Sequence, residues 1–100
     1  MAAALVADIL AGFPGVAEAV VVGVPDADAG QVPVAFYRTT SPDPGAEALL
    51  RYLADRVDAL SVPVACLAVQ QWPTTPRGKT DRQKLTALAM KYLSRESGDG

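Results

Sequence analysis

The chain has 100 residues, half of them apolar and a fifth charged, with a formal net charge of -2. This length and composition are typical of one soluble globular domain, which has little room for both a packed core and a deep substrate pocket. The single cysteine, Cys66, and the lack of histidine exclude an intramolecular disulfide, an ordinary zinc site and a histidine-based catalytic triad.

The charged residues of both signs are interspersed without long runs, so the sequence shows no electrostatic footprint for nucleic acid or an anionic membrane. The alanine-rich residues 1–7 lack a basic flank and are followed by Asp8, which argues against a signal peptide. No apolar run approaches the ~20 residues of a membrane span. We therefore expect a cytoplasmic protein with no nucleic-acid or membrane partner.

The first predicted element is a short helix over residues 3–13. Its apolar residues, which recur at four-residue spacing or lie beside those positions, are Leu5, Val6, Ile9, Leu10 and Phe13. Gly12, Pro14 and Gly15 end this helix, because glycine and proline both disfavour a continuing helix.

Two strands are predicted next, over residues 16–24 and 32–39, because the first segment is nearly all β-branched or small and the second alternates between two faces. The second strand alternates, with Val32, Val34 and Phe36 on one face and Ala35 and Tyr37 on the other. Residues 25–30 are turn formers, so we expect the two strands to be antiparallel.

A second helix follows the breaker segment 41–45. Asp43 is its expected cap, Pro44 its first residue, and Glu47 lies in its first turn, near the positive end of the helix dipole. The apolar residues at helical spacing are Leu49, Leu50, Leu53, Val57 and Leu60. The pair Val62 and Pro63 is expected to end the helix.

The remaining residues predict a third strand over 64–69, an ordered but irregular loop over 70–80 and a last helix capped by Asp81. The expected buried stripe of that helix consists of Leu85, Leu88, Ala89 and Tyr92. Residues 94–100 are predicted to be a flexible tail. The order of elements predicts an α+β domain over residues 1–93, with a sheet of about three strands flanked by three helices.

The segment WPTTPRGKTDR, residues 72–82, is too specific in composition to be a simple connection. Its Gly-Lys-Thr triplet at 78–80 is like the end of a phosphate-binding P-loop. That motif needs a glycine five positions earlier, where this chain has Pro73, and proline lacks the backbone N–H and the freedom in φ that such a loop uses. A P-loop is therefore excluded.

Residues 75–82, followed by Leu85, are similar to the threonine-proline-small-glycine-lysine-aliphatic-aspartate-arginine signature that closes the acyl-adenylate-forming enzymes. Residues 14–26, followed by the Gly-Gln pair at 30–31 and by Ala-Phe at 35–36, resemble the head of the same domain in acyl-CoA synthetases. The chain thus resembles the small C-terminal domain of that superfamily, over about residues 5–88.

Three residues depart from the family pattern. Ser61 replaces the usual lysine before Val-Pro, Arg77 replaces a serine or asparagine, and Thr80 replaces an aliphatic residue. None of these changes removes Lys79, the lysine of the signature. The family's large N-terminal domain is missing from the sequence, so we expect that this chain is not active alone.

The resemblance implies that Lys79 is the catalytic lysine of an acid–thiol ligase. In this family a carboxylate attacks the α-phosphorus of ATP to give an acyl-adenylate and pyrophosphate, and a thiol then takes the acyl group. The residues expected to support the lysine loop are Thr75, Pro76, Gly78, Asp81 and Arg82. No metal and no cofactor is expected on this chain alone. The complete enzyme would use ATP, Mg²⁺ and either CoA or a phosphopantetheine thiol.

The implied partners are a large N-terminal adenylation domain, in cis or in trans, and an acyl carrier protein. The alternative function is a non-catalytic interaction domain that binds a carrier protein or a partner synthetase.

For Arg82, a helix-surface position and a functional contact are equally compatible with the sequence. Trp72 is expected to pack the loop on the core, and Asp26 and Asp28 to be turn residues rather than metal ligands.

Overall fold

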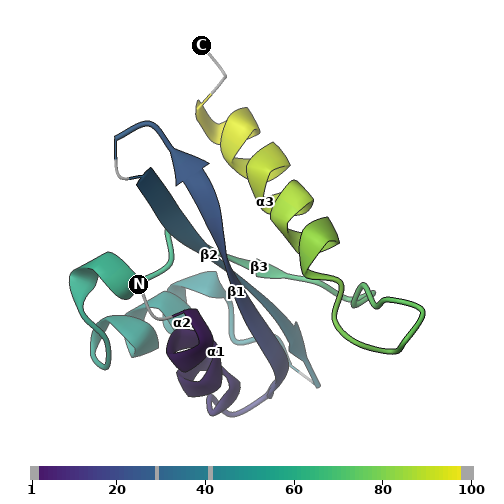
Figure 1. The fold of residues 1–100 in the computed structure, drawn as a ribbon. Helices are drawn as coiled ribbons and strands as arrows, with labels where there is room; N and C mark the ends of the chain where they lie inside the picture. Colours follow the sequence, from purple (N-terminus) through teal and green to yellow (C-terminus); the bar gives the residue numbers. More distant parts are fainter. Residues whose placement is uncertain (1–2, 29, 41, 98–100) are drawn as a thin grey trace.

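A computed structural model describes residues 3–28, 30–40 and 42–97. In chain order the elements are α1 (Ala3–Ala11), β1 (Val16–Asp26), β2 (Gly30–Thr39), α2 (Ala46–Ala54), the 3-10 turn η1 (Ala59–Ser61), β3 (Ala65–Ala68) and α3 (Arg82–Ser97). The strands form one sheet in the order β1-β2-β3, antiparallel between β1 and β2 and parallel between β2 and β3. The predicted α+β domain with a three-stranded sheet and three helices is confirmed (Figure 1).

The hairpin of β1 and β2 divides the core into two clusters, because successive side chains of a strand point to opposite faces of a sheet. On β2, Ala35 and Tyr37 join the cluster that packs against α1 and α2, whereas Val34 and Phe36 join the cluster beneath α3. The predicted alternation of this strand is thus confirmed, and the sheet is covered by helices on both faces.

Helix α1 ends at Ala11, two residues before the predicted end. The N–H groups of Gly12 and Phe13 bond to carbonyls three residues earlier, which closes the helix in a tighter turn. Val6 and Leu10 are buried, whereas Leu5 is 56% exposed. The buried face of α1 is therefore centred on Val6 and Leu10, one residue after the positions of the predicted four-residue repeat that starts at Leu5. Phe13 packs edge-to-face against Tyr52 of α2, with the ring centroids 4.9 Å apart.

Helix α2 is shorter than predicted, and its start differs. Gly45, at φ 90°, precedes the helix, and Asp43 accepts the Gly45 N–H at 2.8 Å without capping the helix itself. Pro44 therefore lies outside the helix rather than at its first position. The helix ends at Ala54, because the N–H groups of Arg56 and Val57 both bond to the Leu53 carbonyl and turn the chain.

The segment between α2 and β3 corrects another prediction. Val57 and Leu60 follow α2 instead of continuing it, and the predicted end at Val62 and Pro63 comes too late. Leu60 lies on η1 and is 86% exposed, so it makes no contribution to the core. The Ser61 hydroxyl donates to Asp58 at 2.8 Å, and this hydrogen bond lowers the pKa of Asp58.

Helix α3 packs on the sheet by a narrower stripe than predicted. Leu85 and Ala89 are buried and Leu93 is partly buried, whereas Leu88 is 46% and Tyr92 36% exposed. The buried residues are spaced four apart, so one line of side chains faces the sheet. Leu88 and Tyr92, which each precede a residue of that line, lie on the side of α3 toward β3. The helix also runs to Ser97, through part of the predicted tail, and residues 98–100 lie outside the described part.

Cys66 lies in the cluster under α1 and α2, and burial raises the pKa of its thiol from 9.0 to about 11. At pH 8 the thiolate fraction of the folded chain should therefore be about a hundredfold below that of the unfolded chain. We expect iodoacetamide to alkylate Cys66 at least about a hundredfold more slowly in buffer than in denaturant, as mass spectrometry would measure.

The raised pKa of Cys66 also determines how the stability of the domain changes with pH. The unfolded chain releases the thiol proton at a lower pH than the folded chain, so the free energy of unfolding should fall as the pH rises from 9.0 to about 11. A Cys66→Ala variant is the control, because it lacks this titration. Equal alkylation rates in buffer and denaturant would contradict the burial of the thiol.

Candidate functional site

The loop between β3 and α3 is an ordered hairpin. Thr74 and Thr80 form an antiparallel bridge, and the Thr75 N–H donates to the Lys79 carbonyl at 2.7 Å. The Gly78 N–H donates to the Thr75 carbonyl at 2.8 Å, which closes a turn with Pro76 in its second position. Gly78 has a φ of +83°, a conformation in which a side chain would be strained.

Lys79 follows this turn with its backbone fixed and its side chain in solvent. Its N–H donates to the Thr75 hydroxyl at 3.3 Å and its carbonyl accepts from the same residue, so Thr75 holds it on both sides. The residue is exposed. A proline, a left-handed glycine and a hydrogen-bonding threonine therefore combine to present one ammonium group outward, as the sequence pattern of the loop indicates.

The base of the hairpin is attached to the core through Trp72. The indole Nε1–H donates to the Thr80 hydroxyl at 3.0 Å, and Trp72 packs against the core cluster beneath α3. The Asp81 N–H donates to the Pro73 carbonyl at 2.9 Å and closes the neck of the loop. The expectation that Trp72 packs the loop on the core is confirmed.

Two residues join the hairpin to the following helix. Asp81 accepts the Lys84 N–H at 3.1 Å and is thus the predicted cap of α3. The Arg82 guanidinium donates to the Val21 carbonyl at 2.8 Å, on β1 at the edge of the sheet. Arg82 therefore ties the start of α3 to a strand that lies 61 residues earlier, a contact that the sequence did not reveal.

The acidic residues of the β1–β2 turn form a local turn contact. The Asp28 N–H donates to the Asp26 carboxylate at 3.1 Å, as in an Asx turn. Among the described residues, no group of three or more histidine, cysteine, aspartate or glutamate side chains could hold a metal ion. Within the same residues, no helix is long and apolar enough to cross a membrane.

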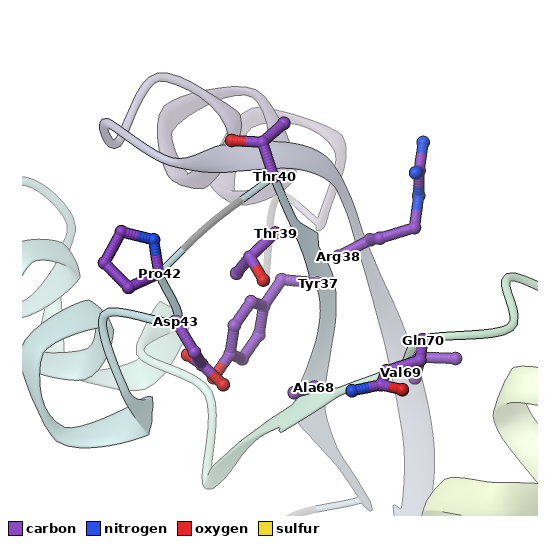
Figure 2. A pocket seen from close by; sticks show the side chains of 9 residues that line it. All are labelled: Tyr37, Arg38, Thr39, Thr40, Pro42, Asp43, Ala68, Val69 and Gln70. Atoms are coloured by element: carbon purple, nitrogen blue, oxygen red, sulfur yellow. The ribbon is translucent and has the colours of Figure 1, made fainter.

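A pocket of about 410 Å³ opens where β2 and β3 end (Figure 2). Its central feature is Tyr37, whose hydroxyl donates to Asp43 at 2.9 Å; Arg38 leaves the strand on the other side and pairs with Glu18. Burial, and secondarily the bond to Asp43, raises the pKa of Tyr37 well above its ordinary range. The hydroxyl thus stays protonated and ties β2 to the segment before α2.

None of the predicted site residues is among those that line this pocket. Lys79, Thr75, Pro76 and Gly78 are brought together in the hairpin, which projects from the domain instead of enclosing a cavity. The arrangement can deliver a positive charge to another surface, and it offers no enclosed substrate site of its own.

Thr80→Val tests how the hairpin is attached, because valine keeps the shape of threonine but removes the acceptor for the Trp72 indole. The expected cost is about 1 kcal/mol in the free energy of unfolding, with a more mobile loop. Trp72 is the only tryptophan, so its fluorescence reports this loop directly. Acrylamide should quench it more strongly in Thr80→Val, whereas Thr80→Ser should match the parent. Identical quenching in all three proteins would contradict the role of the hydrogen bond.

Comparison with known proteins gives consistent results. Residues 5–79 match the family model described as the AMP-binding enzyme C-terminal domain. A 2-succinylbenzoate–CoA ligase of Staphylococcus aureus is 38% identical over 73 residues, which cover 73% of this chain and 15% of the ligase. An acetyl-coenzyme A synthetase of Pyrobaculum arsenaticum is 36% identical over 80 residues, 76% of this chain and 12% of the synthetase.

The similarity extends to a solved three-dimensional structure. The amide bond synthetase McbA from Marinactinospora thermotolerans superposes with a TM-score of 0.78 at 35% identity, covering 84% of this chain and 17% of that chain. The present chain thus spans 15% or less of the two curated relatives described above.

Proposed function

The chain belongs to the family of AMP-binding enzyme C-terminal domains, and from this premise we propose that it completes an ATP-dependent ligase that joins a carboxylate to a thiol. Its named curated relatives are a CoA ligase and a coenzyme A synthetase. In such an enzyme a large domain would hold ATP, Mg²⁺ and the carboxylate. The present domain would supply a mobile cation to that site.

The cation in this proposal is Lys79. Attack of a carboxylate on the α-phosphorus brings two anions together, so a positive charge at the reacting oxygens lowers the barrier. A lysine suits this task because its ammonium is a compact charge on a long, flexible stem. The observation that supports the proposal is the hairpin itself, which fixes the Lys79 backbone through Thr75 and leaves the side chain exposed.

The rigid attachment of the hairpin has a consequence for catalysis. Bonds from Trp72 to Thr80, from Asp81 to Pro73 and from Arg82 to β1 make the loop move with the domain as one body. Lys79 can then be inserted and withdrawn by rotation of the whole domain, with little ordering of the loop at each step. We therefore propose that Thr75, Pro76, Gly78, Asp81 and Arg82 position the lysine without touching substrate.

The acceptor in the second step is proposed to be the thiol of CoA or of a phosphopantetheine arm on a carrier protein. In that step the thiol sulfur attacks the acyl carbon, its proton is released, and AMP leaves with the bonding electrons. The departing AMP gains one negative charge on its phosphate in this step. The proposal gives Lys79 no part in it, because rotation of the domain has by then withdrawn the lysine from the site.

The test is reconstitution with the large adenylation domain and measurement of carboxylate-dependent exchange of pyrophosphate into ATP. The parent chain should support exchange, and Lys79→Ala should support it at a far lower rate. Exchange at the parental rate by Lys79→Ala would overturn the catalytic assignment.

A further inference from the structure

The hairpin and helix α3 together carry a concentration of positive charge. Residues 77–97 contain six of the nine lysines and arginines but two of the eleven aspartates and glutamates, a net charge of +4 in a chain whose total is -2. Two of these cations, Arg77 and Lys79, belong to the hairpin, and Arg82 bonds to β1. The others, Lys84, Lys91 and Arg95, lie on α3 and are exposed.

These three cations share one side of the helix with Leu88. Residues 84, 88, 91 and 95 follow the spacing of four, three and four that places side chains in one line along a helix. The stripe is separate from the buried line of Leu85 and Ala89 and extends over about 16 Å, at 1.5 Å per residue. Figure 1 shows α3 rising from the hairpin along one side of the sheet.

Two adjoining hollows lie along this stripe. One, of about 390 Å³, begins at Gln71 and Pro73 beside the hairpin, and the other, of about 260 Å³, lies between α3 and the edge strand β3. Both hollows are lined by Leu88 and Lys91, so together they form one groove, which we call the α3 groove. Its further lining residues are Phe36, Leu67, Ala68, Lys84, Ala87, Tyr92 and Arg95.

The α3 groove combines an apolar floor with a basic rim. Phe36, Leu67 and Leu88 supply the floor, and Lys84, Lys91 and Arg95 the rim; no carboxylate among the described residues lines either hollow. In the described part of the chain the apolar side chains Leu88 and Tyr92 are 46% and 36% exposed. Such a surface complements a ridge that is apolar along its centre and negatively charged on its flanks.

We propose that the α3 groove is a docking site for an acidic amphipathic helix of a partner protein. The groove matches about three turns of such a helix, and the leucine at its centre gives an apolar anchor at the i, i+3/i+4 spacing of helix-in-groove binding. A strand is a poorer fit, because β3 offers an edge of four residues only. The groove is concave, which disfavours a flat lipid surface, and its apolar floor disfavours nucleic acid.

This inference is independent of the reaction assigned to Lys79. Neither Lys79 nor Arg77 lines the groove, and binding there requires no ATP site. The two proposals can therefore fail separately. A Lys79→Ala variant should bind the acidic helix as the parent does.

The experiment uses the 100-residue chain and a designed helical peptide with leucines along one face and glutamates on both flanks. Isothermal titration and amide chemical shifts of the labelled chain should give saturable binding, with the shifts concentrated at residues 67–68 and 84–95. Lys91→Glu combined with Arg95→Glu should weaken binding about tenfold or more, because two attractions become repulsions. The control is Arg51→Glu, which reverses an exposed cation on α2, away from the groove.

Further measurements distinguish the acidic helix from other possible ligands of the α3 groove. A peptide with the same leucines but lysines on its flanks should not bind, and raising the salt from 0.05 to about 0.5 M should weaken binding of the acidic peptide. Equal binding of the acidic and the basic peptide would overturn the proposal. So would binding of the acidic peptide to the Lys91→Glu, Arg95→Glu variant with the affinity of the parent. Binding of phosphatidylglycerol vesicles with the same residue dependence would replace it with a membrane surface, and self-association lost in the reversed variant would replace it with a second copy.

Discussion

Replacing Lys79 by alanine should lower the rate of acyl-adenylate formation roughly a hundred- to thousandfold, which corresponds to ~3 to 4 kcal/mol by analogy with one donor at an oxyanion. The physical reason is the loss of a positive charge where two anions approach each other. The measurement is pyrophosphate exchange with the reconstituted enzyme. Release of the acyl group from preformed acyl-adenylate to the thiol should change much less, since that step needs no contact from Lys79.

Controls on the same hairpin separate a charge effect from a structural one. Arg77→Ala removes an exposed cation two residues away and should leave exchange near the parental rate, because its side chain has no part in the proposed contact. Lys79→Arg keeps a positive charge in a broader, planar group and should recover only part of the rate. Folding should be unaffected in all three variants, since the hairpin bonds of residue 79 are made by its backbone. An equal loss in both steps would instead indicate a defect in folding or domain association.

Phe36→Ala should be the most destabilising single substitution, at about 3 to 5 kcal/mol of the free energy of unfolding. Phe36 is 1% exposed, is among the largest fully buried side chains and belongs to the cluster beneath α3. A domain of this size has a total of roughly 5 to 15 kcal/mol, so the variant is expected to be partly unfolded near 37 °C. Urea denaturation followed by Trp72 fluorescence and by circular dichroism would measure the loss.

The location of Phe36 also predicts which part loosens first. Leu85 and Ala89 supply the fully buried contacts of α3, and both belong to the cluster that contains Phe36. Amide exchange should therefore increase in α3 and the hairpin before it increases in α1. Leu60→Ala is the matched control: Leu60 is 86% exposed, and its loss should change stability by less than about 0.5 kcal/mol. Comparable losses in the two variants would contradict the assigned core.

The consequence for the proposed function is a coupling between core and hairpin. Trp72 packs on the same cluster as Phe36 and holds Thr80 through its indole. A defect in this part of the core should therefore reach Lys79 through the neck of the loop, even though Lys79 itself is exposed.

Much of this protein was determined by its sequence alone. The alternation of β2 placed Ala35 and Tyr37 opposite Val34 and Phe36, and the structure confirms this division. The turn residues of the loop were also predictable, because each acts locally: Pro76 and Gly78 make the turn, and Asp81 caps the next helix. The hairpin itself was not predicted, since the sequence indicated an irregular loop over residues 70–80. Local patterns of this kind depend on neighbours within a few residues and survive any choice of packing.

The tertiary structure decided the rest, because periodicity gives the apolar face of a helix but not the width of the surface that covers it. Leu88 and Tyr92 fit the predicted stripe of α3, yet the three-stranded sheet covers only the line through Leu85 and Ala89, and the uncovered pair becomes part of the α3 groove. The bond from Arg82 to Val21 joins residues 61 positions apart. Contacts at such separation exist only once the chain has folded.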